Sequence, residues 1–159
     1  MHRLKIFPAI MLIVLLFPSP GVLEEAKNSK LIENSVIITS PAPKSNVRQK
    51  VVVKGKAYLP GGYPLWIVSR HEDFRPLWWP QREAEVNPAT KQWESLAFLG
   101  GPQDIGSQFD IGAIVVNGEA HAKLRNYWVK AMRTGDWMPI ELPKTVIAPK
   151  LIRVTKTGH

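Results

Sequence analysis

Residues 48–58 read Arg-Gln-Lys-Val-Val-Val-Lys-Gly-Lys-Ala-Tyr, and their pattern is the clearest indication of the fold class. Small or apolar residues alternate here with a second set made of lysines and one valine. The first set is Val51, Val53, Gly55 and Ala57. A period of two residues with one apolar and one charged face is typical of a strand that is buried on one side only. The stretch therefore predicts an antiparallel sheet with one face on a core and the other in water.

Short apolar segments separated by Gly and Pro continue this pattern along the chain. The predicted strands cover residues 35–39, 48–58, 64–70, 77–86, 92–99, 108–117 and 147–155. The segment 64–70 is apolar on both faces, as expected of a strand in the interior of a sheet. Pro80 indicates an edge strand or a bulge, because proline cannot donate to a strand ladder. Strands at this spacing predict a β-sandwich.

One segment, residues 119–133, has the periodicity of a helix instead. Its apolar residues fall on one face and its basic residues on the other. The apolar face consists of Ala120, Leu124, Tyr127, Trp128, Ala131 and Met132. Asn117 is suited to cap the start of this helix and Gly135 to end it. The segment predicts an amphipathic helix packed on the sandwich; an alternative is a helix lying on a membrane surface.

The N-terminus carries the features of an export signal. Arg3 and Lys5 precede an apolar run at residues 6–17, and Pro18-Ser19-Pro20-Gly21 ends the run. We interpret residues 1–21 as a signal peptide or an N-terminal membrane anchor. Residues 22–34 are then a linker, and residues 35–157 are the β-sandwich domain.

This interpretation places the domain outside the cytoplasm, in the periplasm, at the cell surface or secreted. If the N-terminal segment is not cleaved, residues 4–23 contact the membrane and anchor the protein there. The chain has no cysteine, so its fold does not depend on disulfides and thiol catalysis is excluded. The formal net charge is +8. Outside the cytoplasm this charge favours envelope glycans, anionic polymers or lipid headgroups as partners, and no nucleic acid; a merely solvated basic surface is the alternative.

A set of short motifs occurs in a familiar order. They are Ile38-Thr39-Ser40-Pro41, Val53-Lys54-Gly55, residues 65–70, Trp79-Pro80-Gln81, Trp93, Gly106-x-x-Phe109-x-Ile111 and residues 113–116. Over residues 35–156 the chain resembles the immunoglobulin-like or fibronectin-III-like bacterial β-sandwich modules of exported and membrane-tethered proteins. The resemblance implies an immunoglobulin-like antiparallel sandwich and a binding, spacing or sensory role rather than catalysis. The helix departs from a plain sandwich of this kind.

Catalytic and metal-binding patterns are sparse. Glu83 and Glu85 lie two residues apart on one predicted strand, about 7 Å by strand rise, which could suit glycoside hydrolysis. His71-Glu72-Asp73 is the one dense group of metal-capable side chains, and a solvated turn explains it better. A Ser-His-Asp set could combine Ser69 or Ser107 with His71 and with Asp73 or Asp110, but no nucleophile elbow is present. We therefore predict no catalytic residue, metal or cofactor.

Six tryptophans carry more information than any catalytic pattern. Trp66 and Trp93 are predicted in the core, and Trp128 is predicted to dock the helix on a sheet. Trp78 and Trp79 are adjacent, so in a strand one faces inward and the other outward. The sequence does not say which of the two is exposed.

An outward tryptophan with basic and amide side chains nearby could stack on a sugar ring or an acidic polymer. The predicted ligand-binding residues are Trp78, Trp79, Arg70, Arg75, Gln81 and Arg82. The alternative is that the helix or the loop 101–107 covers the outward ring. The sequence thus predicts a non-catalytic recognition or structural module of the cell envelope. The alternative functions are a glycan-acting hydrolase that uses Glu83 and Glu85, and a structural subunit that contacts only another protein.

Overall fold

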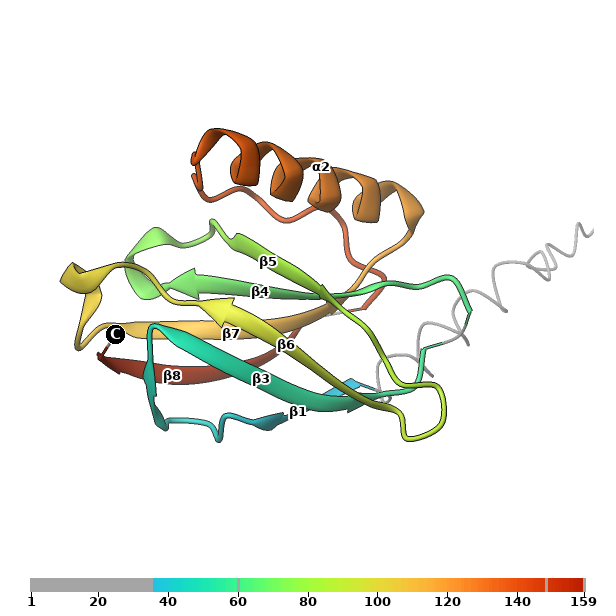
Figure 1. Ribbon diagram of the computed structural model, residues 1–159, viewed down its shortest axis with the longest axis horizontal. Helices are drawn as coiled ribbons and strands as arrows, with labels where there is room; N and C mark the ends of the chain where they lie inside the picture. The colour runs from blue at the N-terminus through green and yellow to red at the C-terminus, as the bar shows by residue number, and fades with distance from the viewer. Residues whose placement is uncertain (1–35, 60, 148, 159) are drawn as a thin grey trace, which may run out of the picture.

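The computed structural model describes residues 36–59, 61–147 and 149–158. The predicted signal or anchor and the predicted linker lie outside these residues. The described chain forms three layers, which are a three-stranded sheet, a five-stranded sheet and one long helix (Figure 1). Within the described ranges, no helix combines the length and the apolar character needed to span a bilayer.

The two sheets differ in size. Sheet A has the order β1-β3-β6 and contains β1 (Val36–Ser40), β3 (Lys50–Ala57) and β6 (Gln92–Phe98). Sheet B has the order β2-β8-β7-β4-β5 and contains β2 (Asn46–Arg48), β4 (Leu65–His71), β5 (Trp79–Ala84), β7 (Gln108–Val115) and β8 (Lys150–Gly158). Neighbouring strands are antiparallel except β2 and β8, which are parallel. The prediction of a mainly β sandwich with one late helix is confirmed.

The stretch that predicted the fold contains parts of two strands rather than one. The chain leaves sheet B after Arg48 and enters sheet A at Lys50, so the prediction of one continuous strand over 48–58 is wrong at its start. From Lys50 onward the alternation holds, with Val53, Gly55 and Ala57 buried. The periodicity gave no sign of the change of sheet, because β2 is only three residues long.

The main core lies between the two sheets. Trp93 on β6 belongs to it, as predicted, and stands opposite Gly55 in the register of β3 and β6. A Cβ atom at Gly55 would overlap the Trp93 ring and the backbone oxygen of Ile37. The glycine is therefore required because the indole ring occupies the space of its missing side chain.

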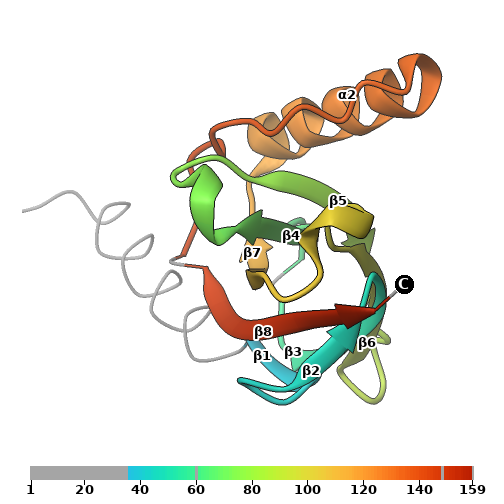
Figure 2. The same cartoon turned by 90° about the vertical axis from the view of Figure 1, so that its left-hand side faces the viewer.

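A second core lies on the other face of sheet B, under α2 (Gly118–Thr134) (Figure 2). Its buried members are Trp66, Val68, Trp78, Ile114, Val116, Ala120 and Leu124. Trp66 is buried as predicted, but against the helix, where its indole N–H donates to His121 Nδ1 at 3.1 Å. This second layer explains why the segment 64–70 is apolar on both faces.

The predicted helix boundaries are confirmed by the capping contacts. The side chain of Asn117 accepts a hydrogen bond from the backbone N–H of Ala120 at 2.9 Å, and Gly135 ends the helix in the left-handed region with φ 74°. Met132 departs from the expected pattern. It was assigned to the buried face, but 56% of its surface is exposed.

β5 is the edge strand that Pro80 predicted, and its pairing with β4 shifts register at Gln81. The Gln81 side chain forms hydrogen bonds at the point where the register shifts. Its Nε2 donates to Ser69 Oγ at 2.9 Å and to the Trp79 carbonyl at 3.2 Å, and its Oε1 accepts from the backbone N–H of Phe98 at 2.8 Å. Gln81 thus ties sheet B to the edge strand β6 of sheet A.

We expect Gly55→Ala to destabilise the fold by about 1–3 kcal/mol, because the added methyl overpacks the Trp93 ring. Urea unfolding followed by tryptophan fluorescence measures the change. Gly61→Ala is the matched control, since a Cβ at Gly61 meets no atom within 4 Å. Equal stability of the two variants would contradict this account of the core.

Candidate functional site

The structure divides the six predicted ligand-binding residues between two places on sheet B. Arg70, Arg75 and Trp78 lie with Asp110 on the face that also carries the helix. The other three residues line a pocket at the β5 edge of the sandwich; they are Trp79, Gln81 and Arg82. The sequence predicted one surface, whereas the fold forms two.

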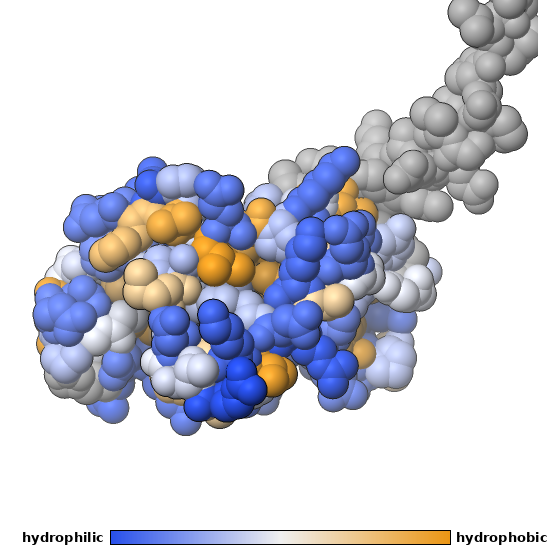
Figure 3. All heavy atoms as spheres, turned by 90° about the horizontal axis from the view of Figure 1, so that it is seen from above, coloured by the Kyte–Doolittle hydropathy of each residue, from blue (hydrophilic) through white to orange (hydrophobic). Residues whose placement is uncertain are grey.

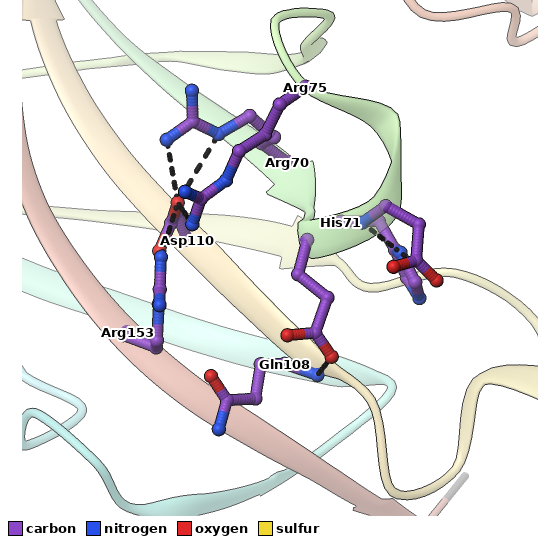
Figure 4. Close-up of polar contacts among 8 residues, drawn as sticks. Arg70, His71, Arg75, Gln108, Asp110 and Arg153 are labelled. Carbon is purple, nitrogen blue, oxygen red and sulfur yellow. Dashed lines mark hydrogen bonds and ion pairs between the residues drawn. The ribbon is translucent and has the colours of Figure 1, made fainter.

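The first place is an arginine cluster, which we define as Arg70, Arg75 and Arg153 around Asp110 (Figure 4). Arg70, Asp110 and Arg153 are register partners on β4, β7 and β8, so the sheet itself aligns them in one row. The distances from Asp110 Oδ2 are 2.7 Å to Arg70 Nη2 and 3.3 Å to Arg75 Nη2. Arg153 Nε donates to Asp110 Oδ1 at 2.8 Å.

Asp110 is held in its charged form by these arginines. Burial alone raises the pKa of its carboxyl, but the hydrogen bonds and positive charges of Arg153 and Arg70 lower the pKa by more, so that it lies below the ordinary value of 3.8. The same hydrogen bond raises the pKa of Arg153. The cluster is therefore ionised throughout the neutral and mildly acidic range.

Trp78 is the tryptophan of the adjacent pair that is buried. Only 7% of its surface is exposed, and the guanidinium carbon of Arg70 lies 4.2 Å from its ring centroid. A cation over an indole face at this distance is an attractive contact. The buried Trp78 ring thus packs against the Arg70 guanidinium and is not available to stack on a ligand.

The second place is an aromatic pocket of about 610 Å³. Strands of both sheets, the loop at residues 100–104 and the C-terminal part of α2 line it. Its aromatic and apolar walls include Phe74, Trp79, Leu96, Phe98, Phe109, Trp128, Met132 and Trp137. Its polar walls include Ser69, His71, Gln81, Arg82, Gln103 and Asp104.

Contacts between the aromatic side chains fix the shape of the pocket. The indole N–H of Trp79 donates to the Trp137 carbonyl at 2.6 Å, and Phe74 packs edge-on against Trp79 with centroids 5.4 Å apart. Tyr127 packs edge-on against Trp137, and burial, followed by the Asp136 carboxylate, raises the pKa of this tyrosine to about 12. Trp79 is the partly exposed member of the adjacent pair, whereas Trp78 is buried.

The helix face of the molecule carries exposed apolar side chains between hydrophilic ones (Figure 3). Those next to the pocket are Met132 and Trp137, with Val129 and Met138 also exposed nearby. The exposed Arg82 guanidinium lies 5.5 Å from the Trp128 ring centroid. The pocket therefore combines apolar ring surfaces with the positive charge of Arg82 at its rim and the carboxylate of Asp104 in its wall.

His71 lies in the wall of this pocket. Its Nδ1 accepts a hydrogen bond from the backbone N–H of Asp73 at 3.1 Å, so the neutral ring carries its proton on Nε2. Nε2 is buried without a hydrogen-bond partner in the described chain and lies 3.9 Å from Asp104 Oδ1. Asp73 Oδ2 lies 3.8 Å from His71 Nδ1, but the Glu72 carboxylate turns away and accepts from the backbone N–H of Gln108. The described residues include no group of three or more such side chains placed to hold a metal ion.

The two predicted hydrolase carboxylates have different neighbours. Glu83 Oε2 lies 3.9 Å from His121 Nδ1 beside the helix, whereas Glu85 follows the end of β5 and lines a groove over β3 and β6. Neither carboxylate lines the aromatic pocket. Ser69 and His71 share the pocket wall, but the Ser69 hydroxyl accepts its hydrogen bond from Gln81.

The sequence did not predict Asp110 and Arg153 as members of a ligand site, and of the pocket walls it predicted only Trp79, Gln81 and Arg82, so that Trp128 and Trp137 were missed among others. A signal for Asp110 was present, since it is the one acid in the apolar segment 108–117. Trp137 follows the helix in a segment without strand or helix periodicity, so no pattern pointed to it.

Comparison with protein-family models found no matching family, and comparison with curated protein sequences found no significant relative. The resemblance to immunoglobulin-like or fibronectin-III-like modules therefore stays a prediction, and the function rests on the geometry of the two sites.

We expect Asp110→Asn to lower the free energy of unfolding at pH 7 by about 2–3 kcal/mol, because it removes the carboxylate charge that all three arginines share. The folded pKa of Asp110 is below the unfolded one, so this contribution is present above about pH 4 and is lost as the pH falls through the folded pKa. Urea unfolding of both proteins at several pH values measures it. A stability difference that stays constant from pH 7 to pH 2 would contradict the assignment.

Proposed function

We propose that this protein is a non-catalytic, exported binding module of the cell envelope that recognises a glycan in the aromatic pocket. The observation that carries the proposal is the meeting of Trp79, Trp128 and Trp137 at one open pocket. These residues come from β5, from α2 and from the segment after the helix, so the fold and not local sequence brings them together. Indole rings offer large, rigid and amphipathic surfaces that suit the apolar face of a sugar ring.

The polar groups of the pocket support a carbohydrate ligand. Gln81, Gln103 and Arg82 supply amide and guanidinium groups next to the rings. The three hydrogen bonds of Gln81 hold its amide in place, so it shapes the wall more than it contacts a ligand. Among the lining residues Arg82 is an exposed cation, whereas the carboxylate of Asp104 is only partly exposed and accepts from the backbone N–H of Gly101, so the accessible charge favours an acidic sugar.

Binding is better supported than hydrolysis. Glu83 and Glu85 lie outside the pocket and have separate neighbours, so the pair does not face a common sugar ring there. The expected export signal at residues 1–21 and the positive net charge agree with a partner in the envelope.

We expect the full-length protein to bind tetragalacturonate, an acidic oligosaccharide, more tightly than the neutral tetramer of N-acetylglucosamine. Trp79→Ala should weaken tetragalacturonate binding at least tenfold, about 1.4 kcal/mol, because a stacking surface is lost. Titration calorimetry measures both affinities.

Two variants serve as controls for that experiment. Trp79→Phe keeps a ring but loses the N–H bond to Trp137, so it should retain most of the binding. Tyr58→Ala removes an aromatic ring that is 61% exposed and remote from the pocket wall, and it should bind as the wild type does. Binding of neither oligosaccharide, or unchanged binding by Trp79→Ala, would overturn the proposal.

A further inference from the structure

The arginine cluster has more positive charge and more donors than Asp110 can satisfy. Three guanidinium groups offer about fifteen N–H donors. In the described chain, the hydrogen bonds they give all go to this one carboxylate, four to Oδ2 and one to Oδ1. Most of the donors are therefore open to another acceptor or to water.

A count of the charged groups also leaves the arginine cluster with an excess of positive charge. The other acidic group near the cluster is Glu72, which attracts Arg153 but also accepts the backbone N–H of Gln108. Three guanidinium groups thus face two carboxylates. The excess is accessible, because 47% of the Arg75 side chain and 44% of the Arg153 side chain are exposed.

The donors are also held in place before any ligand arrives. Arg70 is fixed by its two hydrogen bonds to Asp110 and by the ring of Trp78 beneath it. Arg153 is fixed by its bonds to both oxygens of Asp110. Such preorganisation lowers the entropy cost of binding, since the side chains do not have to be ordered by the ligand.

From this arrangement we propose that Arg70, Arg75 and Arg153 form a binding site for a phosphate group. A phosphate monoester has three terminal oxygens and can accept from three guanidinium groups at once, whereas a second carboxylate has only two oxygens. The site is separate from the aromatic pocket and does not depend on the proposed glycan function. The phosphate is carried either by a soluble molecule or by a lipid headgroup, and the two sources share this chemistry.

The first arm of the test uses inorganic phosphate and the full-length chain labelled with ¹⁵N. Phosphate replaces chloride at constant ionic strength, and the side-chain Nε–Hε signals of the three arginines are followed. We expect saturable shifts of these signals. Arg75→Gln together with Arg153→Gln should weaken the affinity at least tenfold, while Arg70 keeps its pair with Asp110 and preserves the fold. Arg75→Gln alone is a second, milder variant, because it removes only the longest of the three ion pairs.

Arg125→Gln is the matched control for charge, because Arg125 is an exposed arginine on the helix outside the cluster. It should leave the phosphate affinity unchanged. An absence of saturable shifts in the wild type, or the same affinity in the double variant and in Arg125→Gln, would overturn the proposal.

The second arm distinguishes the two sources of phosphate. Sedimentation is compared between phosphatidylcholine vesicles and vesicles that also contain phosphatidic acid, so that any contact through residues 4–23 is common to both. A preference for phosphatidic acid that the double variant loses supports the lipid headgroup. Saturable phosphate binding without that preference supports a soluble phosphate compound.

Discussion

The rest of the structure depends on one constraint, which is that sheet B is buried on both faces. Its inner face packs on sheet A, and its outer face packs under α2 through Trp66, Val68 and Ile114. Full burial of an aliphatic or aromatic side chain contributes about 1.5–3 kcal/mol, so the second core is a large share of the stability of such a domain. Apolar side chains do not occupy the whole outer face of sheet B. Along β4 the outer face passes from Trp66 and Val68 to Arg70, and along β7 from Ile114 to Asp110. Charged side chains thus begin where the second core ends.

This change from apolar to charged residues forms the arginine cluster, and a second, chemically different site lies at the β5 edge of the sheet. On the outer face, the ladder of β4, β7 and β8 aligns two arginines with Asp110, and Arg75 joins them from the turn after β4. At the edge of the sheet, the Gln81 side chain forms hydrogen bonds at the register shift of β5, and aromatic rings from β5, β6, the helix and the segment after it line the pocket beside it. The two proposed sites use different side chains, so we expect one to bind a phosphate group while the other holds a sugar ring.

The sequence allowed the architecture to be predicted well and the sites only in part. Period-two and helical patterns depend on burial along one element, so they predicted the strands, the edge position of Pro80 and the capped helix between Asn117 and Gly135. Which face a residue occupies depends on contacts between elements that are distant in the chain. For that reason Trp66 was assigned to the core but not to the helix side of it, and six predicted ligand residues were placed on one surface instead of two. Asp110 and Arg153 are brought together only by the register of β7 and β8, which no pattern along the sequence reveals.

The two proposed sites are independent of each other: the arginine cluster lies on the outer face of sheet B, and the aromatic pocket lies at its β5 edge. The most direct measurement is a pair of NMR titrations of one protein sample, first with tetragalacturonate and then with inorganic phosphate, and then in the reverse order. The account predicts that the sugar shifts the indole signals of Trp79, Trp128 and Trp137, that phosphate shifts the guanidinium signals of Arg70, Arg75 and Arg153, and that saturation with one ligand leaves the affinity for the other unchanged. Displacement of one ligand by the other, or a single set of signals that responds to both, would contradict it.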